Sequence, residues 1–68
     1  MHPDWVSVFS TNRSYEAEMV KVMLESNDIT SIVVNKQDSA YLIGEIEVYV
    51  STGDALLAKH FIEQNENE

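Results

Sequence analysis

The sequence predicts an α+β domain built from three strands and two helices in the order βαββα. Three segments rich in β-branched and aromatic residues have the length of strands, and two others carry apolar residues at helical spacing. This order is that of a ferredoxin-like plait that lacks its last strand, with a three-stranded antiparallel sheet and both helices on one face. We expect a single domain over residues 1–68, with an ordered core from about 4 to 63 and a polar tail at 64–68.

The N-terminal half predicts one strand and one helix. Residues 5–10, WVSVFS, have the composition of a strand, and the polar residues 11–14 offer helix-capping side chains. The helix that follows should end near Asn27, a residue that tolerates the left-handed backbone conformation. Its apolar residues recur at i, i+4, i+7 and i+8, and we expect them to face the core. They are Tyr15, Met19, Val22 and Met23, with Ala17, Val20 and Leu24 beside them.

The C-terminal half predicts two strands and a second helix. Residues 29–35, ITSIVVN, form a short β-branched run, and residues 45–50, EIEVYV, alternate polar and apolar side chains. Residues 36–44 make the longest connection of the domain. An amphipathic helix follows residues 51–54, which supply further capping side chains. Its apolar residues are Ala55, Leu57, Ala58, Phe61 and Ile62.

The predicted strand order leaves one edge of the sheet open. In this plait the third strand lies between the first two and is antiparallel to both, and the missing fourth strand would pair with the first. Residues 6–10 should therefore present unpaired backbone groups. A core of this size leaves only about 3–5 kcal/mol of net stability, so we expect a homo-oligomer in which a second subunit adds support.

Side-chain alternation assigns the strand residues to two faces of the sheet. The side chains expected on the helix-covered face are Val6, Val8, Ile32, Val34, Ile46, Val48 and Val50. The helix-free face then carries a large apolar patch, formed by Trp5, Phe9, Val33 and Tyr49. Because such a patch is rarely left open on a monomer, we interpret it as a subunit or partner interface. The alternative is that Trp5 and Phe9 are core residues and the register of the first strand is shifted by one.

The connection at 36–44 is the candidate ligand or partner loop. Its chemically versatile residues are Lys36, Asp38, Ser39, Tyr41 and Gly44. Together they offer a cation, a carboxylate, two hydroxyl groups and a flexible backbone position, which suit contact with a partner or with a small anion. The alternative is structural, with a local turn at Asp38 and Ser39 and with Tyr41 folded onto the core. The chain contains no GxxxxGK[ST] or GxGxxG motif, so no familiar phosphate-binding loop is present.

Charge and composition exclude several classes of function. The formal net charge of −8 repels nucleic acid and anionic membrane surfaces. Aromatic side chains on the open face of a plait can stack RNA bases, but here they lie beside Glu45 and Glu47. No apolar run approaches the roughly 18 residues of a membrane span, and the N-terminus lacks the features of a secretory signal. We therefore expect a cytoplasmic protein with no nucleic-acid partner and no membrane contact.

Catalytic and metal-binding patterns are weak. The absence of cysteine excludes disulfides and thiolate metal sites. His60 and Glu63 have a spacing that could place two metal ligands on one helical face, but without further ligands an exposed helical His beside a Glu is the commoner situation. Glu45 and Glu47 could share a cation or a proton, yet a solvated strand face also explains them. With no nucleophile and base in a readable arrangement, we expect no enzyme, no metal and no cofactor.

Three phrases of the sequence resemble a known family. They are VFSTN at 8–12, YEAEMVKVMLES at 15–26 and NKQDSAYLIGEIEVYV at 35–50, and the segment from Asp38 through Gly44 to Val48 is the most specific. Together they resemble the family of small bacterial domains named putative prokaryotic signal-transducing proteins, a domain family of unknown function. The similarity extends from about Trp5 to Ile62.

The resemblance implies a PII-like reduced plait. PII proteins associate through their sheet faces and use the loop between their second and third strands for partner contact, the position of residues 36–44 here. This loop is much shorter than that of PII proteins, and the basic, glycine-containing segments that hold nucleotide phosphates are missing. The resemblance therefore implies the fold and an oligomer, but not nucleotide sensing.

The function that these observations favour is a non-enzymatic interaction or signal-transducing module. It would act by self-association and by contact with a partner protein. The alternative hypothesis is a small-molecule sensor that binds a metabolite or nucleotide near the 36–44 loop.

Overall fold

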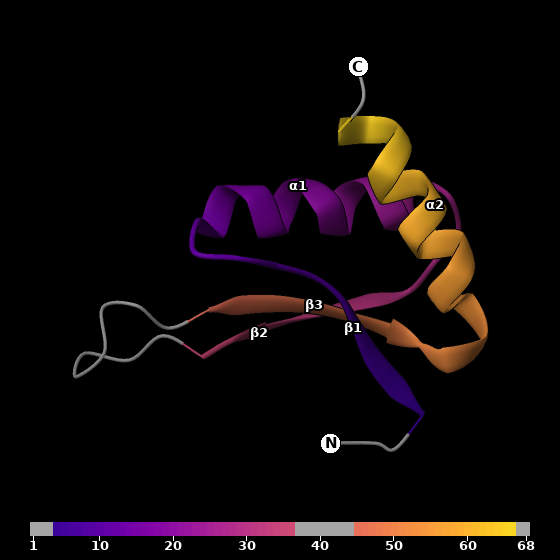
Figure 1. Cartoon of the computed structure of the whole chain (residues 1–68), viewed down its shortest axis with the longest axis horizontal. Helices are drawn as coiled ribbons and strands as arrows, with labels where there is room; N and C mark the ends of the chain where they lie inside the picture. The colour runs from indigo at the N-terminus through magenta and orange to yellow at the C-terminus, as the bar shows by residue number, and fades with distance from the viewer. Residues whose placement is uncertain (1–3, 37–44, 67–68) are drawn as a thin grey trace.

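The computed structural model describes residues 4–36 and 45–66 of the chain. The elements follow the predicted order βαββα, and the fold is an α+β ferredoxin-like plait (Figure 1). They are β1 (Trp5–Thr11), α1 (Ser14–Glu25), β2 (Ser31–Asn35), β3 (Ile46–Ser51), a 3₁₀ turn η1 (Thr52–Asp54) and α2 (Ala55–Glu66).

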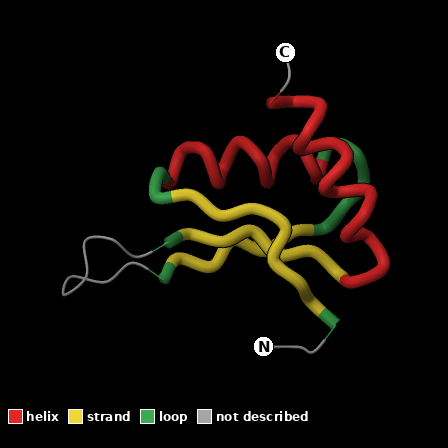
Figure 2. The backbone as a smooth tube through the Cα atoms, viewed as in Figure 1, coloured by secondary structure: helices red, strands yellow, loops and turns green. Residues whose placement is uncertain are grey.

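The sheet has the strand order β1-β3-β2, and β3 is antiparallel to both neighbours. Both helices cover the same face of the sheet, and the other face has no helix over it (Figure 2). The prediction that β1 forms an edge of the sheet is confirmed. Backbone N–H and C=O groups on the outer side of β1 therefore have no neighbouring strand within the described residues.

The core lies between β3 and the two helices. Ile46, Val48 and Val50 of the central strand are at most 1% exposed, as their alternation predicts. Each such side chain contributes about 1.5–3 kcal/mol by leaving water. The other buried apolar residues are Ala17, Val20, Leu24, Ile29, Ala58 and Ile62.

A β-bulge in β1 corrects the predicted position of Phe9. Ser7 pairs with Tyr49, but Phe9 pairs with Val48, so Val8 is an extra residue in the ladder. An extra residue reverses the alternation beyond it. Phe9 therefore faces the helices and packs against the core, as does Val8, and the prediction that Phe9 lies on the helix-free face is wrong. The alternative of a one-residue shift is correct for Phe9 but not for Trp5, which precedes the bulge.

The alternation of β2 is also opposite to the prediction. Val33 pairs with the buried Val48 and packs against the core, whereas Ile32 pairs with Tyr49 on the other face. The cause lies just before the strand, where Ile29 is buried at 2% exposure. Because strand side chains alternate with a period of two, burial of Ile29 directs Val33 inward as well.

The face of helix α1 that is buried against the sheet is narrower than predicted. Ala17, Val20 and Leu24 are buried, and their spacing of three and four residues defines the inward face. Tyr15, Met19 and Val22 are 59–64% exposed, so their predicted place in the core is wrong. Ala17 has only a methyl group, which permits close approach of the helix to the strands.

The helix ends differ from the sequence prediction in detail. Arg13 precedes α1 without a side-chain cap, and Thr11 instead donates a 2.5 Å hydrogen bond to the Glu16 carboxylate. At the other end, Asp28 takes the left-handed conformation with φ of 64°. Helix α2 continues to Glu66, so residues 64–66 are helical rather than part of a polar tail.

Candidate functional site

The helix-free face of the sheet is the candidate functional site. The pairing register places on it the side chains of Trp5, Ser7, Ser10, Ile32, Val34, Glu47, Tyr49 and Ser51. Ile32 is 42% exposed, and Trp5, Val34 and Tyr49 are half-buried. This face therefore combines an apolar surface on β2 with small hydroxyl side chains on β1.

One corner of this face holds a polar cluster of Lys36, Glu47 and Tyr49. Glu47 and Tyr49 are two residues apart on β3 and thus share a face. The Lys36 ammonium lies 2.8 Å from Glu47 Oε1, and the Tyr49 hydroxyl donates a 2.6 Å hydrogen bond to the same oxygen. Lys36 Nζ also lies 6.0 Å from the centre of the Tyr49 ring, within the range of a cation–π contact.

The backbone fixes this cluster at the end of the β2-β3 pair. The Lys36 N–H donates a 2.9 Å hydrogen bond to the Glu45 carbonyl, one step beyond the last strand residues. The cluster therefore stands at the two ends of the connection 37–44. The predicted loop residues Asp38, Ser39, Tyr41 and Gly44 lie outside the described residues, so only Lys36 of that set is placed.

Charge pairing within the cluster shifts two pKa values. The Lys36 hydrogen bond, and then that of Tyr49, lowers the pKa of Glu47 from its ordinary 4.5. The same contact with Glu47 raises the pKa of Lys36 above 10.5. Both groups are therefore charged around neutral pH. Because a general acid or base works best with a pKa near the operating pH, this pair is poorly matched to proton transfer.

The predicted interface residues divide between the two faces. Trp5 and Tyr49 lie on the helix-free face, while Phe9 and Val33 pack against the core on the other. Sequence reasoning missed Ile32 and Val34, which lie on the helix-free face on either side of Val33 in β2, while Ser10 takes the place on β1 predicted for Phe9. The burial of Ile29 fixes the alternation of β2, and it is known only from the packing in the structure.

The structure also bears on the candidate metal ligands of α2 and on membrane-spanning helices. His60 and Glu63 are both exposed on α2. Within residues 4–36 and 45–66, His, Cys, Asp and Glu side chains form no group of three that could hold a metal ion. Neither helix in that part of the chain has the length and apolar character required to cross a membrane.

The fold and its helix-free face define a small α+β plait domain. The chain matches the family described as "Putative prokaryotic signal transducing protein" over residues 5–66, and it belongs to that family. The match extends slightly beyond the region in which the sequence phrases suggested the resemblance. No curated protein and no solved structure matches the chain.

Proposed function

We propose that this domain is a non-enzymatic, cytoplasmic interaction module of the signal-transducing type, whose copies associate through the helix-free face and the β1 edge. The observation that supports it most is the apolar surface around Ile32, Val34, Trp5 and Tyr49 on a face without a covering helix. A second sheet packed face to face would bury these side chains as a sandwich does. The contact loop for other proteins would be residues 36–44, next to the Lys36–Glu47 pair.

The proposal has a direct test in the exposed side chain of Ile32. Ile32→Asp places a charge at the centre of the proposed contact, where burial without a partner is costly, and should convert the oligomer to monomer. Light scattering over a dilution series measures the mass. Because Ile32 is 42% exposed, the monomer should keep its fold, which circular dichroism verifies.

A matched control comes from another exposed aliphatic residue, Leu56. Leu56 is 86% exposed on α2, away from the sheet face, so Leu56→Asp should leave the mass unchanged. A wild-type chain that stays monomeric at all concentrations refutes self-association. An Ile32→Asp variant that remains assembled shows instead that the contact lies elsewhere.

The alternative of a small-molecule sensor receives less support from the geometry. It requires Lys36 as the point charge for an anionic ligand, but the ammonium is already 2.8 Å from Glu47. A ligand anion would have to displace this carboxylate or share the lysine with it. The Lys36–Glu47 pair therefore favours an interaction surface over an anion site.

A further inference from the structure

Helix α1 carries a second apolar surface that neither the core nor the proposed sheet contact uses. Tyr15, Met19 and Val22 are 59%, 60% and 64% exposed. Their spacing of four and three residues places them on one side of the helix, roughly opposite the inward face of Ala17 and Leu24. We call these three residues the α1 stripe. Three large apolar side chains in a row on the outside of one short helix mark a binding surface.

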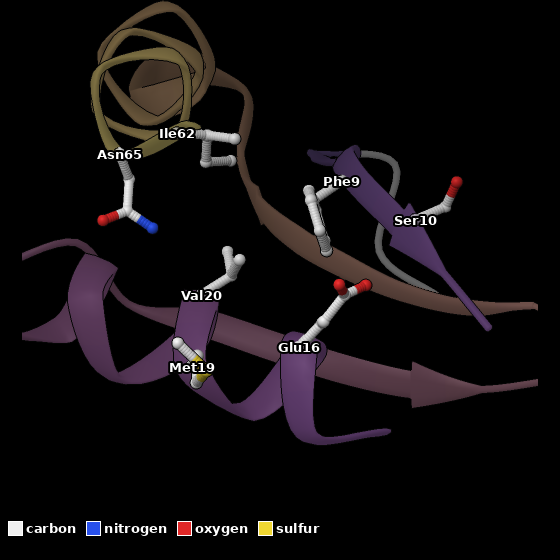
Figure 3. Close-up of a pocket in the computed structure, with 7 residues that line it drawn as sticks. All are labelled: Phe9, Ser10, Glu16, Met19, Val20, Ile62 and Asn65. Carbon is white, nitrogen blue, oxygen red and sulfur yellow. The ribbon is translucent and has the colours of Figure 1, made fainter. Parts of the chain in front are cut away.

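Met19 and Val22 of the α1 stripe border two hollows on the α2 side of the helix. A hollow of about 410 Å³ lies between α1, the end of β1 and α2. Phe9, Val20 and Ile62 point into it (Figure 3). A second hollow, of about 560 Å³, continues along α1 past Met19, Val22 and Met23. Both hollows are lined by Met19 and Asn65, so they lie next to each other, and we call them together the α1 groove.

The groove exists because the helices diverge. The last turns of α2 rise past α1, away from the sheet (Figure 1), and Ile62 of α2 lines the first hollow together with Val20 of α1. Two methionines line the groove, and their flexible, polarisable side chains adapt to a variety of apolar partners. A groove of this form suits an amphipathic helix laid beside α1.

Carboxylates border the apolar floor of the groove. Glu16 lines the first hollow and Glu18 lines the second, on opposite sides of the α1 stripe. The whole chain, these two glutamates included, has a net charge of −8. Charge complementarity therefore favours a basic occupant. It disfavours a second copy, because two-fold pairing of the α1 stripe would bring these carboxylates close to their own equivalents.

We propose that the α1 groove binds a basic amphipathic helix from a partner protein. Its apolar side rests on Met19 and Val22, and its lysine or arginine side chains reach Glu18, because the Glu16 carboxylate already accepts from Thr11 and lies 3.9 Å from the Arg13 guanidinium. This surface is separate from the helix-free sheet face, so the domain can hold a partner while copies of it remain associated. The proposal stands whether or not the sheet face makes the oligomer.

The test uses three synthetic peptides of about four helical turns. The first places leucines along one side of a lysine-rich helix, the second is a scramble of the same composition, and the third replaces lysine by glutamate. Fluorescence anisotropy with the intact domain at about 0.15 M salt should show the first peptide binding at least about tenfold more tightly than the scramble. The acidic peptide should not bind.

Substitutions at exposed positions of α1 should change peptide binding and leave the fold intact. Val22→Ser and Met19→Ser remove apolar contact, and each should weaken binding of the first peptide about tenfold, a loss of about 1.4 kcal/mol. Glu18→Gln should weaken binding and lessen its dependence on salt. Leu56→Ser removes an apolar side chain that is even more exposed and lies outside the groove, so it should change nothing.

The outcomes that overturn the proposal are distinct. Equal affinity for the scrambled peptide means that only the net charge attracts it. Unchanged affinity in both Val22→Ser and Met19→Ser, with folding verified by circular dichroism, means that the peptide binds elsewhere. A fall in the solution mass of Val22→Ser means that a second copy occupies the groove.

Discussion

Glu47 shows how one side chain joins the strands on either side of the candidate loop. Its Oε1 atom accepts from the Lys36 ammonium beyond β2 and from the Tyr49 hydroxyl on β3. The Glu47 side chain is 18% exposed, whereas that of Lys36 is 50% exposed. Water and salt therefore screen the pair on the lysine side, and its contribution should weaken at high ionic strength.

The lowered pKa of Glu47 predicts a pH dependence of stability. A carboxyl group with a lower pKa in the folded than in the unfolded state stabilises the fold above its ordinary pKa of 4.5. That contribution is lost as the pH falls through the lowered value. Glu47→Gln should therefore reduce the free energy of unfolding near neutral pH, and the difference from wild type should shrink between about pH 5 and pH 3. Urea titrations across this range measure it.

The control for this prediction is Glu45→Gln, which removes a neighbouring carboxylate that is exposed. Its difference from wild type should be small near neutral pH. If the Glu47→Gln difference stays constant from neutral to acid, the pairing with Lys36 does not stabilise the fold.

The C-terminal end of α1 is the clearest case of an element defined by local backbone chemistry. The Ile29 N–H donates to the Leu24 carbonyl at 3.0 Å, and the Asp28 N–H donates to the Glu25 carbonyl at 3.1 Å. This pair of hydrogen bonds is that of a Schellman motif, in which the residue at the turn adopts the left-handed conformation. Asp28 does so with φ of 64°, and Ile29 and Leu24 meet in the core.

This geometry predicts that Asp28→Gly stabilises the protein. Glycine adopts positive φ without steric cost, and the change also removes a negative charge from the negative end of the helix dipole. We expect a gain of about 0.5–1 kcal/mol, measured by thermal or urea unfolding. Asp28→Asn removes only the charge and should give a smaller gain. Asp28→Ala should destabilise the protein, because alanine adopts positive φ at a steric cost. If the alanine variant is as stable as the glycine variant, the positive φ at residue 28 does not determine the stability.

The order of the helices and strands could be predicted from the sequence, but the buried face of each could be predicted only in part. The existence and order of the elements followed from periodicity, and the core face of β3 followed from strict alternation at Ile46, Val48 and Val50. The faces of β1 and β2 did not, because the bulge at Val8 and the burial of Ile29 depend on tertiary packing. On α1, apolar residues occupy both the inner and the outer sides, so spacing alone could not identify the buried one.

Because side chains of β1 and β2 were assigned to the wrong face of the sheet, the predicted candidate site also differed from the observed one. Trp5 and Tyr49 were predicted on the helix-free face and lie there, while Ile32 came to it only through the corrected register of β2. The ion pair of Lys36 and Glu47 joins residues that the sequence separates by the whole 37–44 connection. Composition can suggest each charge, but only the closed β2-β3 pair brings them together.

At the scale of the whole molecule, the excess of acidic residues opposes compactness. Twelve carboxylates and four basic side chains share a domain of 68 residues. Their mutual repulsion falls when salt shortens the screening distance from about 30 Å at 0.01 M to about 3 Å at 1 M. Ion pairs such as Lys36 with Glu47 lose strength in salt, but eight of the twelve acidic side chains would be left over even if every lysine and arginine were paired. Repulsion should therefore dominate the response to salt.

We accordingly predict that sodium chloride stabilises the domain. Between about 0.02 M and about 0.5 M salt, the free energy of unfolding should rise by about 1 kcal/mol, which corresponds to roughly 4–8 °C in melting temperature. Because salt would also favour association of like-charged copies, the Ile32→Asp variant provides the reference in which folding is measured without that contribution. A charge-reduced chain with Glu18→Gln, Glu25→Gln and Glu63→Gln should respond less. A melting temperature that falls with salt in the Ile32→Asp background would mean that the ion pairs outweigh the repulsion.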